Sequence, residues 1–278
     1  MRSTGERKMK KCLKAIAILV LVSILLAPIV GCGEAEEGIL PDSNLEAAVR
    51  EAIGKPEGAI QESDLEGLTE LDASNRRITD LTGLEQCISL TKLNLFHNQI
   101  SDVSPLSNLP SLEWLELWKN QISDVSPLEN LTTLKQLGLY NNQISDITPL
   151  ANLVSLTALF LPSNRIGDIT PLSNLTNLTT LHLANNRISD TSPLSGLTSL
   201  TWLDLSMNQI GDITPLSSLA SLTELYLSYN QISNIGPLVN NEGLSEEDTV
   251  DLTDNPLSAE SIDVHIPQLE ARGVSVWW

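Results

Sequence analysis

Residues 112–133, LEWLELWKNQISDVSPLENLTT, decide the fold, because the same 22-residue pattern, LxxLxLxxNxIxDxxPLxxLxx, occurs seven times in succession from Leu90. The three strand Leu columns, Asn, Ile and Pro keep fixed places in all seven copies, and the Asp column ends with Asn234. Self-similarity at a period of this length is the signature of a repeat architecture. One unit cannot bury its own leucines, but stacked units share a continuous core. The sequence therefore predicts a solenoid.

Each unit contains a strand signal followed by a turn signal. The LxL alternation has a period of two, which predicts a short strand with its leucines on one face. Ser or Thr followed by Pro-Leu, as in Thr148-Pro149-Leu150, predicts the cap and first position of a brief 3-10 or α turn. The Asn between them can bond its amide to the backbone of neighbouring turns. We expect these residues to stack into a ladder: Asn98, Asn120, Asn142, Asn164, Asn186, Asn208, Asn230 and Asn255.

These columns resemble those of leucine-rich repeats, and the 22-residue length with NQISD and PL resembles the bacterial internalin-like type. The resemblance covers residues 68–257. It implies an α/β solenoid with parallel strands on the concave face, short 3-10 or α turns on the convex face and a small helical N-cap. The first unit departs from the pattern, with Arg76 in the Asn column and Ala73 in the third Leu column. Terminal units are expected to be atypical because they cap an open core.

The N-terminus has the features of a targeting segment. A basic stretch to Lys14 precedes AIAILVLVSILLAPIV, which is short for a membrane span but suits a secretory signal. The segment ends IVGC, which resembles the bacterial lipobox and implies that Cys32 is lipidated after removal of residues 1–31. An uncleaved signal anchor is the alternative. We therefore expect an extracytoplasmic protein that is lipid-anchored to the bacterial cell envelope.

Two further segments cap the repeats. Asp42 or Ser43 can cap a helix through NLEAAVREAI that stops at Gly54, and Ser63 can start a second turn. At the other end we expect a helical piece and a final strand, with Trp277 and Trp278 covering the last leucines. The chain then divides into a lipoprotein signal peptide (1–31), a lipidated cysteine and flexible tether (32–38), a helical N-terminal cap (39–67), leucine-rich repeats (68–257) and a C-terminal cap (258–278).

Aromatic residues concentrate on the outward side of the predicted strands. Positions three, five and seven of each unit face outward, and position eight lies at the strand edge. Strand propensity explains a modest enrichment but no preference for the outward side. We expect Trp114 and Trp118 to stand in water beside Glu116, and Phe96, Trp118 and Tyr140 to be neighbours. Eight of the chain's aromatic residues occupy these positions: Phe96, Trp114, Trp118, Tyr140, Phe160, Trp202, Tyr226 and Tyr229.

An exposed aromatic patch of this kind is typical of an interaction site. With Glu116, His182 and Asp204, which interleave with the rings, these aromatics form the predicted partner-binding set. The internalin-like resemblance implies a protein partner, and a carbohydrate stays open. The net charge of −19 disfavours nucleic acid. The alternative is a structural or self-associating envelope scaffold that uses the same patch.

The sequence offers little sign of catalysis. His182, Asp204 and Ser206 are the nearest approach to a nucleophilic triad, but residues on an open strand face are solvated and lack a pocket for an oxyanion. A hydrolase is therefore a remote alternative, and we predict no catalytic residue and no cofactor. The Asp that follows each Ile is expected to cap a turn rather than bind calcium, so we predict no metal site. Cys87 is expected to be buried.

Overall fold

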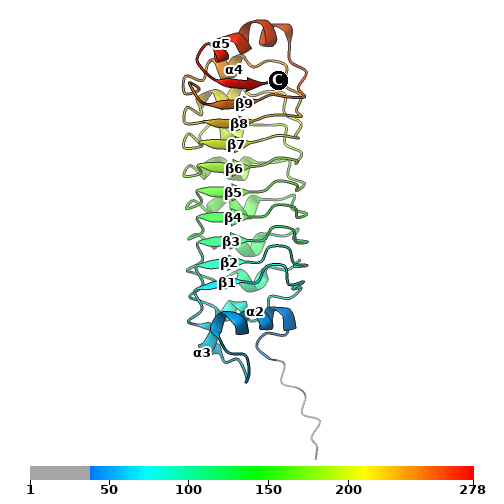
Figure 1. Ribbon diagram of the computed structural model, residues 1–278, viewed down its shortest axis with the longest axis vertical. Helices are drawn as coiled ribbons and strands as arrows, with labels where there is room; N and C mark the ends of the chain where they lie inside the picture. Colours follow the sequence, from blue (N-terminus) through cyan, green and yellow to red (C-terminus); the bar gives the residue numbers. More distant parts are fainter. Residues whose placement is uncertain (1–37) are drawn as a thin grey trace, which may run out of the picture. The chain divides into compact units, whose positions relative to one another are not determined.

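The computed structural model describes residues 38–278, in which ten short parallel strands form one sheet and follow one another in chain order (Figure 1). Each strand spans only three residues, because the LxL segment is followed at once by the turn at the ladder Asn. The strands are β1 (Glu70–Asp72), β2 (Lys92–Asn94), β3 (Trp114–Glu116), β4 (Gln136–Gly138), β5 (Ala158–Phe160), β6 (Thr180–His182), β7 (Trp202–Asp204), β8 (Glu224–Tyr226), β9 (Thr249–Asp251) and β10 (Ser275–Trp277).

The register of the sheet advances by one repeat per strand. Leu93 of β2 pairs with Leu115 of β3, which pairs with Leu137 of β4. The last unit carries three extra residues, and they lie outside the ladder, since Glu224 of β8 pairs directly with Thr249 of β9. Because the register never slips, residues at the same repeat position form continuous columns along the sheet.

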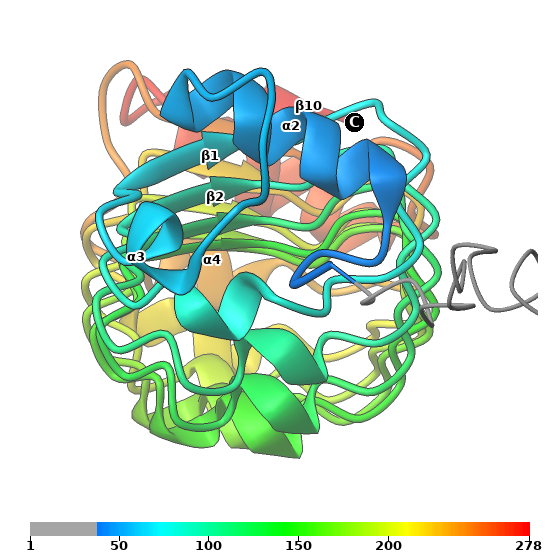
Figure 2. The same ribbon diagram turned by 90° about the horizontal axis from the view of Figure 1, so that it is seen from below.

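The side opposite the strands consists of short 3-10 helices (Figure 2). They are η1 (Leu84–Gln86), η2 (Ser104–Leu106), η3 (Ser126–Leu128), η4 (Thr148–Asn152), η5 (Thr170–Asn174), η6 (Ser192–Leu194) and η7 (Thr214–Ser218). Strands on one side and 3-10 turns on the other confirm the predicted leucine-rich-repeat α/β solenoid.

The cap of these turns differs from the prediction. Thr148 is the first residue of η4 rather than its cap. Asp146, two residues earlier, accepts a hydrogen bond at Oδ1 from the Thr148 backbone N–H (2.8 Å). The same 2.8 Å contact recurs at Asp102, Asp124, Asp168, Asp190 and Asp212. The expected capping role of the Asp column is confirmed. Because the Asp carboxylate accepts from the first backbone N–H of the turn, the Ser or Thr hydroxyl is not needed as the cap.

The core lies between the two sides and runs without interruption through the stack. The leucines of the three strand columns and the following isoleucines are buried along the repeats. Cys87 is fully buried among them, and burial raises the pKa of its thiol to about 12. At neutral pH this thiol is protonated and behaves as a small apolar group, as the sequence predicted.

The repeated Asn side chains link successive coils. Asn142 Oδ1 accepts from the backbone N–H of Ile122 (3.0 Å), and its Nδ2 donates to the carbonyls of Leu117 and Leu139 (3.0 Å each). Each amide thus satisfies backbone groups that no strand pairing reaches. The other members, with the same pattern of contacts, are Asn98, Asn120, Asn164, Asn186, Asn208, Asn230 and Asn255.

The N-terminal cap contains α2 (Ser43–Ile53) and α3 (Glu62–Leu65). Asp42 caps α2, because its Oδ1 accepts from the Asn44 and Leu45 N–H groups, and Gly54 ends it with a left-handed φ of 65°. Both features match the prediction. The second turn begins earlier than expected, since Gln61 rather than Ser63 occupies its cap position.

The C-terminal part contains α4 (Gly236–Val239), a π-helical turn, η8 (Ser261–His265), α5 (Ile266–Glu270) and the edge strand β10. The predicted covering role of Trp277 and Trp278 is wrong, because their side chains are 52% and 57% exposed. In β10, Val276 pairs with Val250 in the inward column, so alternation turns Trp277 outward beside Asp251. Val274 and Val276 pack toward the core instead.

The predicted signal segment and Cys32 lie outside the described residues. Among residues 38–278, no helix has the length and apolar character needed to cross a membrane.

Candidate binding surface on the strand face

The outward side of the sheet, made by positions three, five, seven and eight of each unit, is called the strand face below. All eight predicted aromatic side chains lie on it. Tyr229 is 58% exposed, and the other seven are half-buried. The expectation that Trp114 and Trp118 stand fully in water is therefore wrong. The rings of neighbouring repeats cover one another, and the predicted proximity of Phe96, Trp118 and Tyr140 is confirmed.

Trp118 is the centre of the first aromatic cluster. Its ring centroid lies 6.4 Å from that of Phe96 and 6.1 Å from that of Tyr140, both edge to face. The Phe160 centroid lies 5.9 Å away at a tilt of 59°. These are favourable aromatic arrangements. The four rings are therefore packed against one another in the unbound protein.

An open hollow of about 400 Å³, called the central hollow, lies above this cluster. Its size falls in the range of small-ligand and side-chain pockets. Three small neighbours, Pro162, Ser163 and Ala184, make the depression, and Met207 forms part of its rim. The residues that line it are Trp118, Tyr140, Phe160, Pro162, Ser163, His182, Ala184, Asn185 and Met207.

Met207 is a site residue that the sequence reasoning missed. Its side chain is 53% exposed, and its backbone has a left-handed φ of 57°. Position eight adopts this conformation in every repeat from His97 to Tyr229. Asn and Gly tolerate it well, whereas a large apolar side chain is costly there. The sequence did contain a signal for this residue, because a large apolar Met stands at the position that Asn141 and Asn185 occupy in other repeats.

Glu116 is buried, contrary to the expectation that it is solvated. Its side chain is 6% exposed, although it points to the outward side of β3. The next residue in its column is Gly138, and the carboxylate and the Trp118 indole occupy the space where any larger side chain would stand. Glu116 Oε1 accepts from Gln136 Nε2 (2.8 Å). Desolvation raises the pKa of Glu116 to about 7, against the opposing effect of the Gln136 hydrogen bond.

A second hollow of about 310 Å³, called the N-terminal hollow, lies directly over Glu116. It is separated from the central hollow by Trp118, which lines both. The lining residues are Asn94, Phe96, Trp114, Glu116, Trp118 and Gln136.

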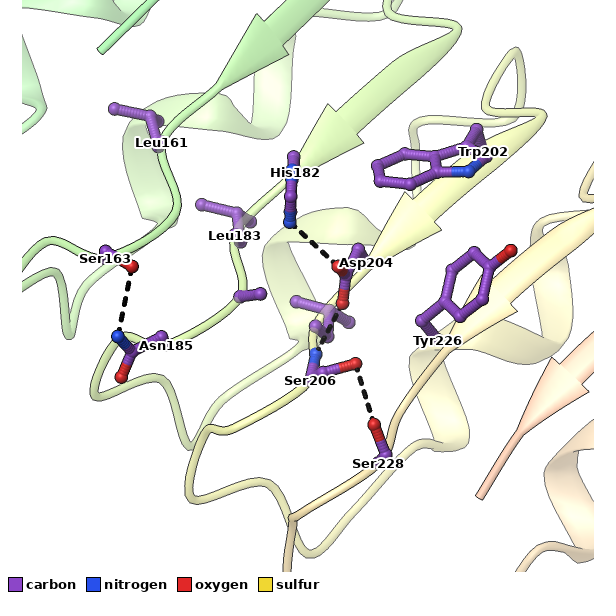
Figure 3. A network of polar contacts seen from close by, with 12 residues as sticks. Leu161, Ser163, His182, Leu183, Asn185, Trp202, Asp204, Ser206, Tyr226 and Ser228 are labelled. Atoms are coloured by element: carbon purple, nitrogen blue, oxygen red, sulfur yellow. Dashed lines mark hydrogen bonds and ion pairs between the residues drawn. The ribbon is translucent and has the colours of Figure 1, made fainter. Parts of the chain in front are cut away.

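The second aromatic cluster lies on β6, β7 and β8 (Figure 3). The Trp202 ring centroid is 5.2 Å from that of His182 and 5.7 Å from that of Tyr226. Glu224 Oε2 accepts from Trp202 Nε1 (3.0 Å) and from the Tyr226 hydroxyl (2.7 Å). The hydrogen bond to Glu224 raises the pKa of Tyr226 to about 12. One carboxylate thus fixes two rings of the strand face.

His182 and Asp204 form an ion-pair contact of 2.8 Å between Nε2 and Oδ2. Burial raises the pKa of Asp204, but hydrogen bonds from His182 and the Ser206 N–H outweigh it and lower the pKa below its usual value. The Ser206 hydroxyl pairs with that of Ser228 (3.1 Å) and not with the imidazole (Figure 3). A nucleophile needs its base within hydrogen-bond reach, so these three residues do not form a triad.

Nor do acidic groups converge on a metal site in residues 38–278, where no group of three or more His, Cys, Asp or Glu side chains could hold an ion. Each Asp of the convex column is occupied by its own turn. In Asp146, hydrogen bonds from the Thr148 side chain and backbone lower the pKa of the carboxyl.

Comparisons with known proteins agree with this geometry. The profile described as Leucine Rich repeats (2 copies) matches residues 66–108, 110–152, 154–196 and 198–240. The chain belongs to the leucine-rich-repeat family. A comparison with curated proteins gives no match.

Several solved leucine-rich-repeat structures are similar. Internalin C2 of Listeria monocytogenes is 42% identical, with a TM-score of 0.72 over 74% of this chain and 92% of that one. The functional domain of Listeria InlJ, which includes a cysteine ladder, is 27% identical, with a TM-score of 0.51 over 78% of this chain and 56% of that one. These neighbours support a leucine-rich-repeat protein of the bacterial internalin type.

A similar plant structure was solved as a complex. The ectodomain of the Arabidopsis thaliana membrane receptor kinase GASSHO1/SCHENGEN3, in complex with CASPARIAN STRIP INTEGRITY FACTOR 2, is 25% identical. The TM-score is 0.60 over 69% of this chain and 25% of that one. The leucine-rich-repeat fold is typically a binding scaffold rather than an enzyme. In this chain the Ser206 hydroxyl pairs with that of Ser228 and has no base beside it.

Proposed function

We propose that this leucine-rich-repeat protein is a non-catalytic, extracytoplasmic receptor-type protein that recognises a protein partner through its strand face. The observation that carries the proposal is the concentration of eight aromatic side chains on that face, three of which (Trp118, Tyr140 and Phe160) line the central hollow. Tyr and Trp provide large contact areas at low entropic cost and dominate binding hot spots. The rings of Trp202 and Tyr226, already held by Glu224, lose little further freedom on binding.

The proposed contact set keeps the residues expected from the sequence. Its aromatic members surround the two hollows and the Trp202 cluster, while Glu116, His182 and Asp204 supply polar contacts. Met207 joins it as part of the rim of the central hollow. A mixed aromatic and polar surface also suits a carbohydrate, which stays a second ligand class for the same face. The proposed residues are Phe96, Trp114, Glu116, Trp118, Tyr140, Phe160, His182, Trp202, Asp204, Met207, Tyr226 and Tyr229.

Capture of the partner from native membranes by chemical cross-linking tests this proposal. The test variant replaces Tyr140, Phe160 and Met207 with Ala, which removes the walls of the central hollow. The control replaces Ile88 and Val154 with Ala. These two are also apolar and exposed (50% and 48%) but lie in turns that lead into the strands, outside the strand face.

A protein captured by wild type and by the control variant, but not by the Tyr140, Phe160 and Met207 variant, supports the proposal. Its direct binding to the purified variants must follow the same order. Equal capture by all three contradicts it and directs attention to the 3-10 side. If glycosidase treatment of the membranes abolishes capture, the ligand of the strand face is a carbohydrate.

Anchoring through a lipid on Cys32 is a separate part of the proposal, supported by the order of basic segment, apolar segment and IVGC. Labelled fatty acid should be incorporated into the wild type in a bacterial host and absent from Cys32→Ser. Incorporation that persists in Cys32→Ser contradicts the lipid anchor but leaves the binding proposal intact.

Self-association is the second candidate function. It is favoured by the exposure of Met207, Tyr229 and Trp277 on the strand face, which adds apolar surface toward its C-terminal end. Sedimentation of the purified protein over a wide concentration range distinguishes the two. A wild-type dimer that becomes monomeric in Tyr229→Ala would favour the self-associating scaffold. A protein that is monomeric at all concentrations would exclude it.

A further inference from the structure

The carboxyl group of Glu116 is shielded from solvent yet incompletely hydrogen-bonded. Its Oε1 accepts from Gln136, but Oε2 is buried without a hydrogen-bond partner, and so is Nε1 of Trp118. Both atoms lie over Gly138. The indole N–H lowers the pKa of Glu116 somewhat, although Trp118 Nε1 and Glu116 Oε2 do not form a hydrogen bond with each other. A buried carboxylate oxygen without a partner is costly, so a ligand that supplies the missing partner would gain affinity.

The Trp118 ring has room to move away from Glu116. It separates the N-terminal hollow of about 310 Å³ from the central hollow of about 400 Å³, and both are open to solvent. A shift of the indole toward the central hollow would uncover Oε2 at the floor of the N-terminal hollow. The edge-to-face contacts of Trp118 with Phe96 and Tyr140 would be exchanged for contacts with a ligand.

The walls of the N-terminal hollow indicate the kind of ligand. Phe96, Trp114 and Trp118 supply three aromatic rings around one carboxylate. Aromatic faces attract ammonium and guanidinium groups, and the attraction grows when the cation is desolvated. The ring of Phe96 already lies 5.4 Å from the Lys119 Nζ. An aromatic cage over an acidic floor therefore favours a cation over a neutral apolar group.

Above the Glu116 pKa of about 7, the nearby charges leave the floor of the hollow negative. Lys92 is paired with Glu70 (2.8 Å) on the preceding strand, and His97 Nδ1 contacts Asn75 (2.8 Å). Lys119 lies over the outer ring of the cage, at Phe96, and no salt bridge joins it to Glu116 among the residues described. From β4 onward, the strand face carries Asp204, Glu224, Asp251 and Asp254 and no Lys or Arg at its outward positions.

We propose that the N-terminal hollow is the subsite for a single cationic side chain of the protein partner, with Glu116 as its counter-ion and Trp118 as the ring that moves to admit it. This inference deepens the proposed function and rests on it for the nature of the partner. The chemistry of the subsite requires only an alkylammonium or alkylguanidinium group, which can be tested without the partner.

Small probes provide that test on the purified protein. Butylammonium, butylguanidinium and the neutral alcohol pentanol are titrated while the indole N–H of Trp118 is followed by two-dimensional NMR. Its signal is assigned from its loss in Trp118→Phe. At pH 8 the two cations should shift this signal in a saturable manner, and pentanol should produce less than a tenth of the shift at the same concentration.

The pH dependence follows from the cage. A bound cation favours ionised Glu116, so binding below the pKa of about 7 must first remove a proton. Affinity for butylammonium should therefore fall about tenfold per pH unit as the pH drops well below 7. Glu116→Gln should bind at least tenfold more weakly at pH 8 and lose the pH dependence.

Two further variants separate the cage from general charge attraction. Glu113→Gln removes the same charge from the same repeat at an exposed position paired with Lys135, and it should leave the affinity unchanged. Trp114→Leu keeps an apolar wall but removes a ring face. It should therefore lower the affinity for butylammonium and leave the response to pentanol unchanged.

The proposal is overturned if pentanol matches the cations, if Glu116→Gln binds butylammonium as tightly as wild type, or if no probe moves the Trp118 signal. In the first case the hollow accepts a neutral side chain. These results do not depend on the capture experiment, so a failure of the subsite and a failure of the proposed function are distinguishable.

Discussion

Removal of one amide from the Asn ladder should destabilise the protein far more than its size suggests. Asn142→Ala deletes three hydrogen bonds of 3.0 Å through which the amide joins its own coil to the preceding one. They run from the Ile122 N–H to Oδ1, and from Nδ2 to the carbonyls of Leu117 and Leu139. The side chain is 8% exposed, so water cannot readily replace the lost partners.

The magnitude follows from which groups are left without a partner. The Ile122 N–H loses its acceptor, and a buried donor left unpaired costs about 1–3 kcal/mol. The carbonyls of Leu117 and Leu139 each also accept from a second Asn of the ladder, at 3.0 and 2.9 Å, so each loses only one of two donors. With about 0.5 kcal/mol for each carbonyl, the total loss is about 2–4 kcal/mol.

Urea unfolding followed by circular dichroism measures this loss. The midpoint should fall at an unchanged dependence on urea, because the surface exposed on unfolding is the same. Gln121→Ala is the control, because Gln121 directly precedes Ile122 in the chain but lies outside the Asn ladder. Its side chain is exposed and makes no hydrogen bond within the described residues. Hydrogen exchange of the Ile122 amide reports the local effect, and its protection should fall in Asn142→Ala only.

Two results would refute this account of the ladder. One is a loss below about 1 kcal/mol, the net value of a single ordinary hydrogen bond. The other is a loss of similar size in Gln121→Ala, which would show that the region tolerates no change for reasons unrelated to the amide. Retained protection of Ile122 with a lowered midpoint would place the damage elsewhere in the coil.

Three other predictions concern the strand face and the turns. Because the folded pKa of Glu116 lies above its unfolded value, wild type loses stability as pH rises from about 4.5 to 7. Glu116→Gln should therefore be more stable than wild type at pH 8, by up to about 3 kcal/mol, and as stable as wild type at pH 4. Urea unfolding at both pH values measures the difference. Gly138→Ala should cost about 1–3 kcal/mol and shift tryptophan fluorescence, because the new Cβ collides with Glu116 and Trp118; an unchanged melting temperature and spectrum would contradict this packing. Asp146→Asn should be nearly neutral and Asp146→Ala destabilising, because Asn234 already caps α4 through its Oδ1 (2.9 Å); calcium should move the melting temperature of wild type by no more than about 1 °C.

The fold could be predicted from the sequence because each column obeys a local rule and then repeats it. Alternation with a period of two turns Leu115 inward and Trp114 outward, and the ladder places every later unit in the same register. Trp277 shows that alternation is the stronger rule. Its size suggested a core position, but Val276 holds the inward column, so the ring faces outward.

The environment of the site could not be predicted in the same way, because it depends on side chains from adjacent repeats. Glu116 was expected in water, since alternation turns it to the outward side of its strand. It is buried because Gly138, one repeat later, leaves a space that Glu116 and Trp118 fill. Met207 was missed for a similar reason, since its part in the central hollow depends on small side chains in the two preceding repeats.

Departures from the repeat consensus therefore matter more to the site than the consensus itself. Gly138 leaves the space that Glu116 and Trp118 of the preceding unit fill, and Pro162 and Ala184 line the central hollow beside Tyr140 and Phe160. The depressions lie beside Trp118 and Phe160 because the register brings position i next to position i + 22. A replacement of Gly138 should for this reason alter ligand contacts made by β3, whereas the same change in a turn should alter none. In a solenoid, a small residue thus shapes the binding surface of the repeat before it.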